Sequence, residues 1–98
     1  MAKRKENPEA KKRSRYEIVI VRSALKQLDK ISDPYYTKIS NEIDLLEFNP
    51  RPFGVEKLTN RDNEYRIRVG VYRIIYSIFD RQLLVEVIDI DHRKQVYR

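Results

Sequence analysis

The sequence predicts an α+β domain in which one strand and two helices precede a β-meander. The strands are expected to form an antiparallel sheet with the helix hairpin packed on one of its faces. Three observations support this fold class. β-Branched residues fill 16–22, apolar residues recur at spacings of three and four from 24 to 46, and the period changes to two after 64. A chain of 98 residues supports a single domain. We divide it into a basic, flexible N-terminal arm, 1–15, and one folded domain, 16–98.

The first half of the domain contains the predicted helices. Tyr16–Arg22 is short and rich in Ile and Val, which is typical of a strand in the central sheet. Ser23 is expected to cap a first helix that ends near residue 32. Asp33–Pro34 then supplies the N-cap and first helical residue of a second helix, which Asn49–Pro50 stops. Helices joined so closely are expected to form a hairpin.

The second half contains the predicted meander. Residues 51–63 form a loop with a short strand at Val55–Leu58. Apolar and polar residues then alternate, and Gly70 permits a tight reversal between adjacent antiparallel strands. A turn at 80–82 leads into a last strand with apolar residues on both faces. The three predicted strands are Tyr65–Val69, Tyr72–Ile78 and Leu83–Ile90.

Arginines are expected to gather on the sheet face that the helices leave open. Strand parity places Arg66 and Arg68 on one face, and a short hairpin sets Arg73 across from or diagonal to them. We expect no carboxylate among these cations. Three apolar residues are assigned to the same face, so a covering partner is implied: Ile75, Val85 and Val87.

Composition restricts the kinds of site that the chain can hold. Residues 1–15 carry seven Lys or Arg and two Glu, which accounts for +5 of the net charge of +6. In the rest of the chain, basic residues are more numerous in the second half, which indicates a polyanionic partner. Without cysteine and with one histidine, a disulfide framework or a zinc centre is not expected. No apolar run has the roughly 20 residues of a membrane helix, so we expect a soluble, cytoplasmic protein.

Two motifs carry a resemblance to a known family. YRIRVGVYRIIYSI, at 65–78, has basic residues alternating with apolar ones before a turn and a tyrosine–arginine pair, and HRKQVYR, at 92–98, ends the chain. Together they resemble the RelE/ParE superfamily of bacterial and archaeal toxin–antitoxin systems, most closely its RelE branch, and the likeness covers 16–98.

The resemblance implies a function and a set of partners. It implies a ribosome-dependent messenger RNA endonuclease that cuts the A-site codon, without metal or other cofactor, through attack of the RNA's 2′-hydroxyl on the adjacent phosphate. It also implies a small RelB-like antitoxin, held in a hetero-oligomeric complex. Five residues match the family's catalytic positions: Arg66, Arg68, Arg73, Arg93 and Tyr97.

Chemistry suggests a role for each candidate. The guanidinium groups stay charged and match phosphate oxygens, so the strand arginines should bind the scissile phosphate. This differs from RelE members that have lysine at the two strand positions. His92 is then a candidate for proton transfer, and Tyr97 for proton acceptance or substrate positioning. Four further cations are assigned to RNA binding: Lys57, Arg61, Lys94 and Arg98.

Alternatives stay open at this point. His92 could only bond a backbone carbonyl after the last strand, and Arg93 could form an ion pair with Asp89 or Asp91. A member of the ParE branch would inhibit DNA gyrase through a protein interface, without catalysis. A third interpretation is a degenerate toxin that serves as a DNA-binding or scaffold module.

Overall fold

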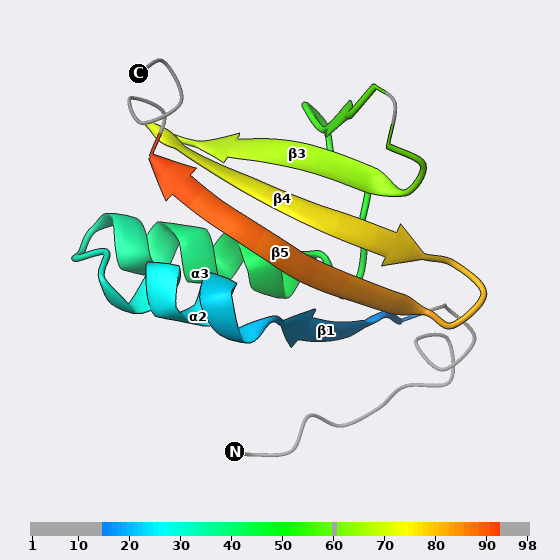
Figure 1. The fold of residues 1–98 in the computed structure, drawn as a ribbon, viewed down its shortest axis with the longest axis horizontal. Coiled ribbons are helices and arrows are strands. Elements are labelled where there is room, and N and C mark those ends of the chain that lie inside the picture. The colour runs from blue at the N-terminus through cyan, green and yellow to red at the C-terminus, as the bar shows by residue number, and fades with distance from the viewer. Residues whose placement is uncertain (1–14, 60, 93–98) are drawn as a thin grey trace.

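A computed structural model describes residues 15–59 and 61–92. The fold has two layers, because a twisted sheet carries both helices on one of its faces (Figure 1). The α+β class and the element order are those that the sequence predicted. In chain order the elements are β1 (Glu17–Ile20), α2 (Arg22–Asp29), α3 (Tyr35–Leu45), β2 (Glu56–Lys57), β3 (Glu64–Val69), β4 (Tyr72–Phe79) and β5 (Leu84–His92).

The sheet is mixed, which corrects the expectation of a purely antiparallel one. Its five strands follow the order β1-β5-β4-β3-β2. β3, β4 and β5 form the predicted antiparallel meander, but β1 lies at the edge and runs parallel to β5. Parallel neighbours need a long crossover, and here the helices and the other strands supply it between β1 and β5.

The helix boundaries differ from the predicted ones. Ser23 does not cap α2, because the helix already begins at Arg22 and Val21 is its N-cap, without a side-chain hydrogen bond. At the start of α3, Pro34 is the N-cap. The preceding Asp33 still satisfies a free backbone donor there, since its Oδ1 accepts from the N–H of Thr37 at 3.0 Å. α3 ends at residue 45 and a turn follows, so it is shorter than predicted.

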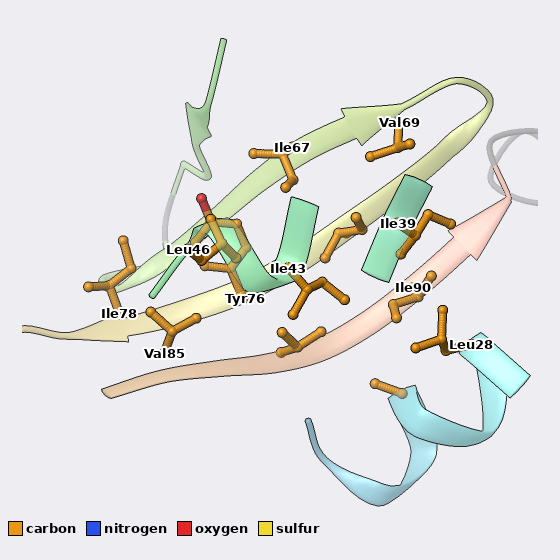
Figure 2. Packing of buried hydrophobic residues seen from close by; sticks show 13 residues of the cluster. Leu28, Ile39, Ile43, Leu46, Ile67, Val69, Tyr76, Ile78, Val85 and Ile90 are labelled. Atoms are coloured by element: carbon orange, nitrogen blue, oxygen red, sulfur yellow. The ribbon is translucent and has the colours of Figure 1, made fainter. Parts of the chain in front are cut away.

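The core lies between the helices and the sheet (Figure 2). Most of its side chains are Ile, Leu or Val, and burying one such side chain completely stabilises the fold by about 1.5–3 kcal/mol. Tyr76 is fully buried, and its hydroxyl donates to the backbone oxygen of Pro50 at 2.8 Å, so its polar group is satisfied. The buried apolar residues are Ala24, Leu28, Ile39, Ile43, Leu46, Ile67, Val69, Ile74, Tyr76, Ile78, Val85, Val87 and Ile90.

A β-bulge in β5 changes which residues face the core. Ile75 pairs with Asp89, but the next residue of β4, Tyr76, pairs with Val87, so Ile88 is an extra residue. Val85 and Val87 are fully buried against the helices, and their assignment to the arginine face was wrong. The open face therefore carries less apolar area than the sequence suggested.

The beginning of the described chain is tied to the helical layer. Arg15, the last residue of the predicted basic arm, donates from Nε to Glu47 at 3.0 Å. Its guanidinium also lies 5.1 Å from the centre of the Phe48 ring. The rest of the predicted arm, 1–14, lies outside the described residues.

Candidate functional site

The three predicted arginines lie on the sheet face opposite the helices. Arg68 is the direct cross-strand partner of Arg73, and Arg66 pairs with Ile75 one row further along β3 and β4. Directly opposed residues of an antiparallel pair have their Cβ atoms about 5 Å apart. Arg68 and Arg73 therefore lie side by side on one face, as strand parity and the short hairpin predicted.

Carboxylates flank these arginines on both sides, contrary to the expectation that none would. Glu56 of β2 is the cross-strand partner of Arg66, and its Oε1 accepts from the Arg66 Nε at 2.9 Å. The hydrogen bond and the charge of Arg66 lower the pKa of the Glu56 carboxyl. This pairing depends on the loop before β3, which brings β2 beside it. Arg66 thus has its own counter-ion.

Arg73 has an incomplete ion pair with Asp91. The two residues are cross-strand partners, yet the Arg73 Nε and the Asp91 Oδ1 are 3.7 Å apart. Neither atom has a hydrogen-bond partner among the described residues, although both are buried. Burial and the neighbouring Asp89 raise the pKa of the Asp91 carboxyl, against the opposing attraction of Arg73. Charge attraction here does not overcome the cost of removing the carboxylate from water.

Arg68 is the exposed member of the set. Within residues 15–59 and 61–92 it forms no ion pair, although its charge contributes to lowering the pKa of Glu56. It also borders a hollow of about 440 Å³ beside Phe53, which is fully exposed. Arg68 is therefore the cation on this face that is most available to an anionic ligand.

Two of the predicted RNA-binding cations are engaged elsewhere. Lys57 donates to the backbone oxygens of Arg61 and Asp62, and its ammonium lies over the ring of Tyr65. Arg61 forms an ion pair with Glu64 at 2.8 Å. Since Lys57 is paired with Tyr65 in the sheet, it points to the face away from Arg66 and its neighbours.

His92 does not join the arginines. It is the cross-strand partner of Tyr72, and their rings meet edge to face at 5.1 Å between centroids. Tyr72 in turn contacts Tyr35 of α3, with 5.4 Å between ring centroids. His92 therefore lies on the helix side of the sheet, whereas Arg73 lies on the open side. In this geometry its imidazole lies on the opposite face of the sheet from the three strand arginines.

The remaining candidates lie outside the described residues. Arg93, Lys94, Tyr97 and Arg98 come after β5 in the sequence. In the described part of the chain, no three His, Cys, Asp or Glu side chains are grouped so that they could hold a metal ion. No described helix has the length and hydrophobicity required to span a bilayer.

Sequence reasoning missed the acidic flanks of the site. Asp89 and Asp91 alternate with apolar residues at the end of the last strand, so they were visible as a pair on one face. The bulge at Ile88 decided that this face is that of Arg73. Glu56 could not be placed, because its partner depends on how the loop 46–63 returns to the sheet.

Comparison with known proteins identifies the family. Residues 18–97 match the model of the family described as "ParE toxin of type II toxin-antitoxin system, parDE". RelE1 of Methanocaldococcus jannaschii is 25% identical over 87 residues, which cover 86% of this chain and 97% of that protein.

Solved structures give the same result for the fold. RelE in the archaeal RelE–RelB complex from Pyrococcus horikoshii OT3 matches with a TM-score of 0.72 and 29% identity, over 80% of this chain and 94% of that one. The isolated E. coli RelE toxin matches with a TM-score of 0.68 and 26% identity, over 84% and 90%. The chain therefore belongs to the ParE toxin family of type II toxin–antitoxin systems, within the RelE/ParE superfamily that its motifs indicated, and is a RelE-like toxin.

Proposed function

We propose that this toxin is a ribosome-dependent endonuclease that cuts messenger RNA in the A site and thereby inhibits translation. One observation carries the proposal: Arg68 and Arg73 oppose each other across β3 and β4 on the face that the helices leave open. An RNA phosphate placed between them would meet two guanidinium groups in one row of the sheet. This is a geometry suited to a doubly charged phosphorane.

The proposed reaction uses the RNA's own nucleophile. The 2′-hydroxyl attacks the adjacent phosphorus and the bond to the 5′-oxygen breaks, which leaves a cyclic phosphate and a free 5′-hydroxyl. Arg68 and Arg73 would bind the non-bridging oxygens and neutralise the charge that develops on them. Arg66 would support them from the next row. The family motif adds Arg93 and Tyr97 from the end of the chain.

An antitoxin is the expected partner of this chain. The comparison structures include RelE bound to RelB from two archaea and from E. coli. A small RelB-like protein that covers the open face would block Arg68 from RNA. We therefore expect that expression of the toxin alone arrests growth, and that co-expression of the adjacent short reading frame restores it. Equal growth with and without that frame would contradict the pairing.

A second candidate function is inhibition of DNA gyrase, as in the ParE branch. The matching family model bears the ParE name, and Glu56 and Asp91 compensate two of the arginines, which a catalytic site does not require. A protein-binding surface tolerates such ion pairs. The exposed Arg68 opposite Arg73 and the terminal HRKQVYR motif favour the nuclease.

Primer extension on a translated message distinguishes the two functions. After induction of the toxin, the nuclease predicts new 5′ ends inside codons, which Arg68→Ala removes. Arg81→Ala is the matched control, because Arg81 is exposed in the β4–β5 turn and forms no interaction among the described residues. Intact message together with a DNA-damage response in arrested cells would instead establish the gyrase function.

A further inference from the structure

Because His92 lies on the helix side of the sheet, a proton acceptor for the site has to come from Tyr97, which is outside the described residues, or from the arginine face itself. The titratable group beside Arg73 is Asp91, which completes a row of three cross-strand residues, Arg68–Arg73–Asp91, on β3, β4 and β5. The row places a carboxylate next to the two cations that would hold the phosphate. The attacking 2′-hydroxyl of a bound nucleotide lies on the carbon next to the one bearing that phosphate.

Two other carboxylates close to the arginines, Glu56 and Asp89, are engaged. Glu56 accepts two hydrogen bonds from Arg66. Asp89 accepts from the Gln27 Nε2 at 2.9 Å, so α2 holds it toward the edge of β5. Asp91 differs, because its Oδ1 is buried without a hydrogen-bond partner in the described chain. Its side chain is still 22% exposed, and it borders a hollow at the edge of β5 that Lys30 and His92 also line.

We propose that Asp91 is the general base of the cleavage reaction, an inference that rests on the proposed nuclease function. The 2′-O–H bond breaks and its proton passes to the Asp91 carboxylate, while the freed oxygen forms the bond to phosphorus. The electron pair of the breaking P–O bond leaves on the 5′-oxygen, which takes a proton from water, and the hydroxide left behind takes the proton from Asp91 and restores the carboxylate. Arg73 keeps its charge throughout and is the cross-strand neighbour of both Arg68 and the base.

The surroundings of Asp91 suit a general base, which must be ionised before the reaction and must then accept a proton. Arg73 faces it from β4, and Asp89 lies two residues away on the same strand. Lys30, the C-cap of α2, and His92 border the same edge of β5. Burial and Asp89 together raise the pKa of Asp91. A stronger base accepts the proton of a weakly acidic hydroxyl more readily.

The test uses programmed ribosomes with one A-site codon, in two forms of the message. The all-RNA message reports cleavage. A message with a single 2′-deoxynucleotide at the cut site cannot be cut and reports binding alone. Asp91→Asn is expected to lower the single-turnover cleavage rate about 100-fold or more, which is typical of a lost general base, with binding of the deoxy message unchanged. The pH–rate profile of the variant should lack the acid limb of the wild type, and Asp91→Glu should restore part of both.

Glu86→Gln is the matched control, because Glu86 lies on the same strand and face but pairs with Ser77 away from the arginines. Its cleavage rate should equal that of the wild type. Circular dichroism melting of each variant checks that the fold is kept. If Asp91→Asn cuts within threefold of the wild-type rate, or loses binding of the deoxy message in proportion to cleavage, Asp91 is not the base. A wild-type protein that binds ribosomes but cuts no message overturns the nuclease function and the inference with it.

Discussion

Replacing Gln27 by methionine should lower the free energy of unfolding by about 2–4 kcal/mol, because this side chain holds the bulged part of β5. Its Oε1 accepts from the backbone N–H of Ile90 at 2.8 Å, and its Nε2 donates to Asp89 at 2.9 Å. β1 pairs with β5 only as far as Val87, so beyond the bulge α2 takes over the edge of the sheet. Gln27 supplies there the acceptor that a neighbouring strand would otherwise provide.

The magnitude follows from the two lost hydrogen bonds. Ile90 is 2% exposed, and a buried backbone donor left without an acceptor costs about 1–3 kcal/mol. The bond to Asp89 is partly buried and adds about 0.5–1.5 kcal/mol. Methionine has a similar volume and high helix propensity, so packing and α2 itself should contribute little to the change.

Urea unfolding followed by circular dichroism measures this difference. Lys26→Met is the matched control, because Lys26 is exposed on the same helix, and it should change the stability by less than about 0.5 kcal/mol. Gln27→Glu keeps an acceptor for the N–H of Ile90 but places a second carboxylate next to Asp89. This variant should therefore also have a lower free energy of unfolding than the wild type, and the difference should become smaller as the pH is lowered and the carboxylates are protonated. A Gln27→Met protein as stable as the Lys26→Met control would refute the idea that this contact holds β5.

Three further changes test the fold and its electrostatics by urea unfolding. Gly70 and Gly54 both have positive φ, but a Cβ on Gly70 would collide with a tyrosine ring of α3, whereas one on Gly54 meets nothing within 4 Å; Gly54→Ala should therefore cost about 1 kcal/mol, and Gly70→Ala clearly more. Equal losses would contradict this. Tyr76→Phe should cost about 1–2 kcal/mol, because it leaves a backbone oxygen without its buried donor, while Tyr72→Phe, whose hydroxyl has no such bond in the described chain, should change little. Asp91→Asn should be more stable than the wild type near pH 7. The raised pKa means that the folded protein favours the neutral carboxyl, so the wild type should lose stability as pH rises from the unfolded pKa through the folded one. The difference should vanish in acid, and a variant less stable at pH 7 would show that the ion pair with Arg73 dominates.

Much of the fold followed from local patterns. The β-branched run at 16–22, the two helical stripes and the period of two after 64 gave the element order, since each reflects which side chains an element can bury. The grouping of Arg66, Arg68 and Arg73 followed in the same way, because Gly70 allows only a short reversal and so fixes the register between adjacent strands. The family motifs lie in these same strands and in the segment after them.

The role of each face of β5 required the tertiary structure. Alternation places Val85, Val87, Asp89 and Asp91 on one face, and the single extra residue at Ile88 separates them by turning the later residues over. Whether a strand can hold an extra residue depends on what lies beside it. For β5 these neighbours are the end of β1 and Gln27 of α2, and both are distant in the sequence. The sequence by itself therefore determined the elements and the arginine row. Long-range packing decided that Asp91 completes that row and that His92 lies against Tyr72 on the other side.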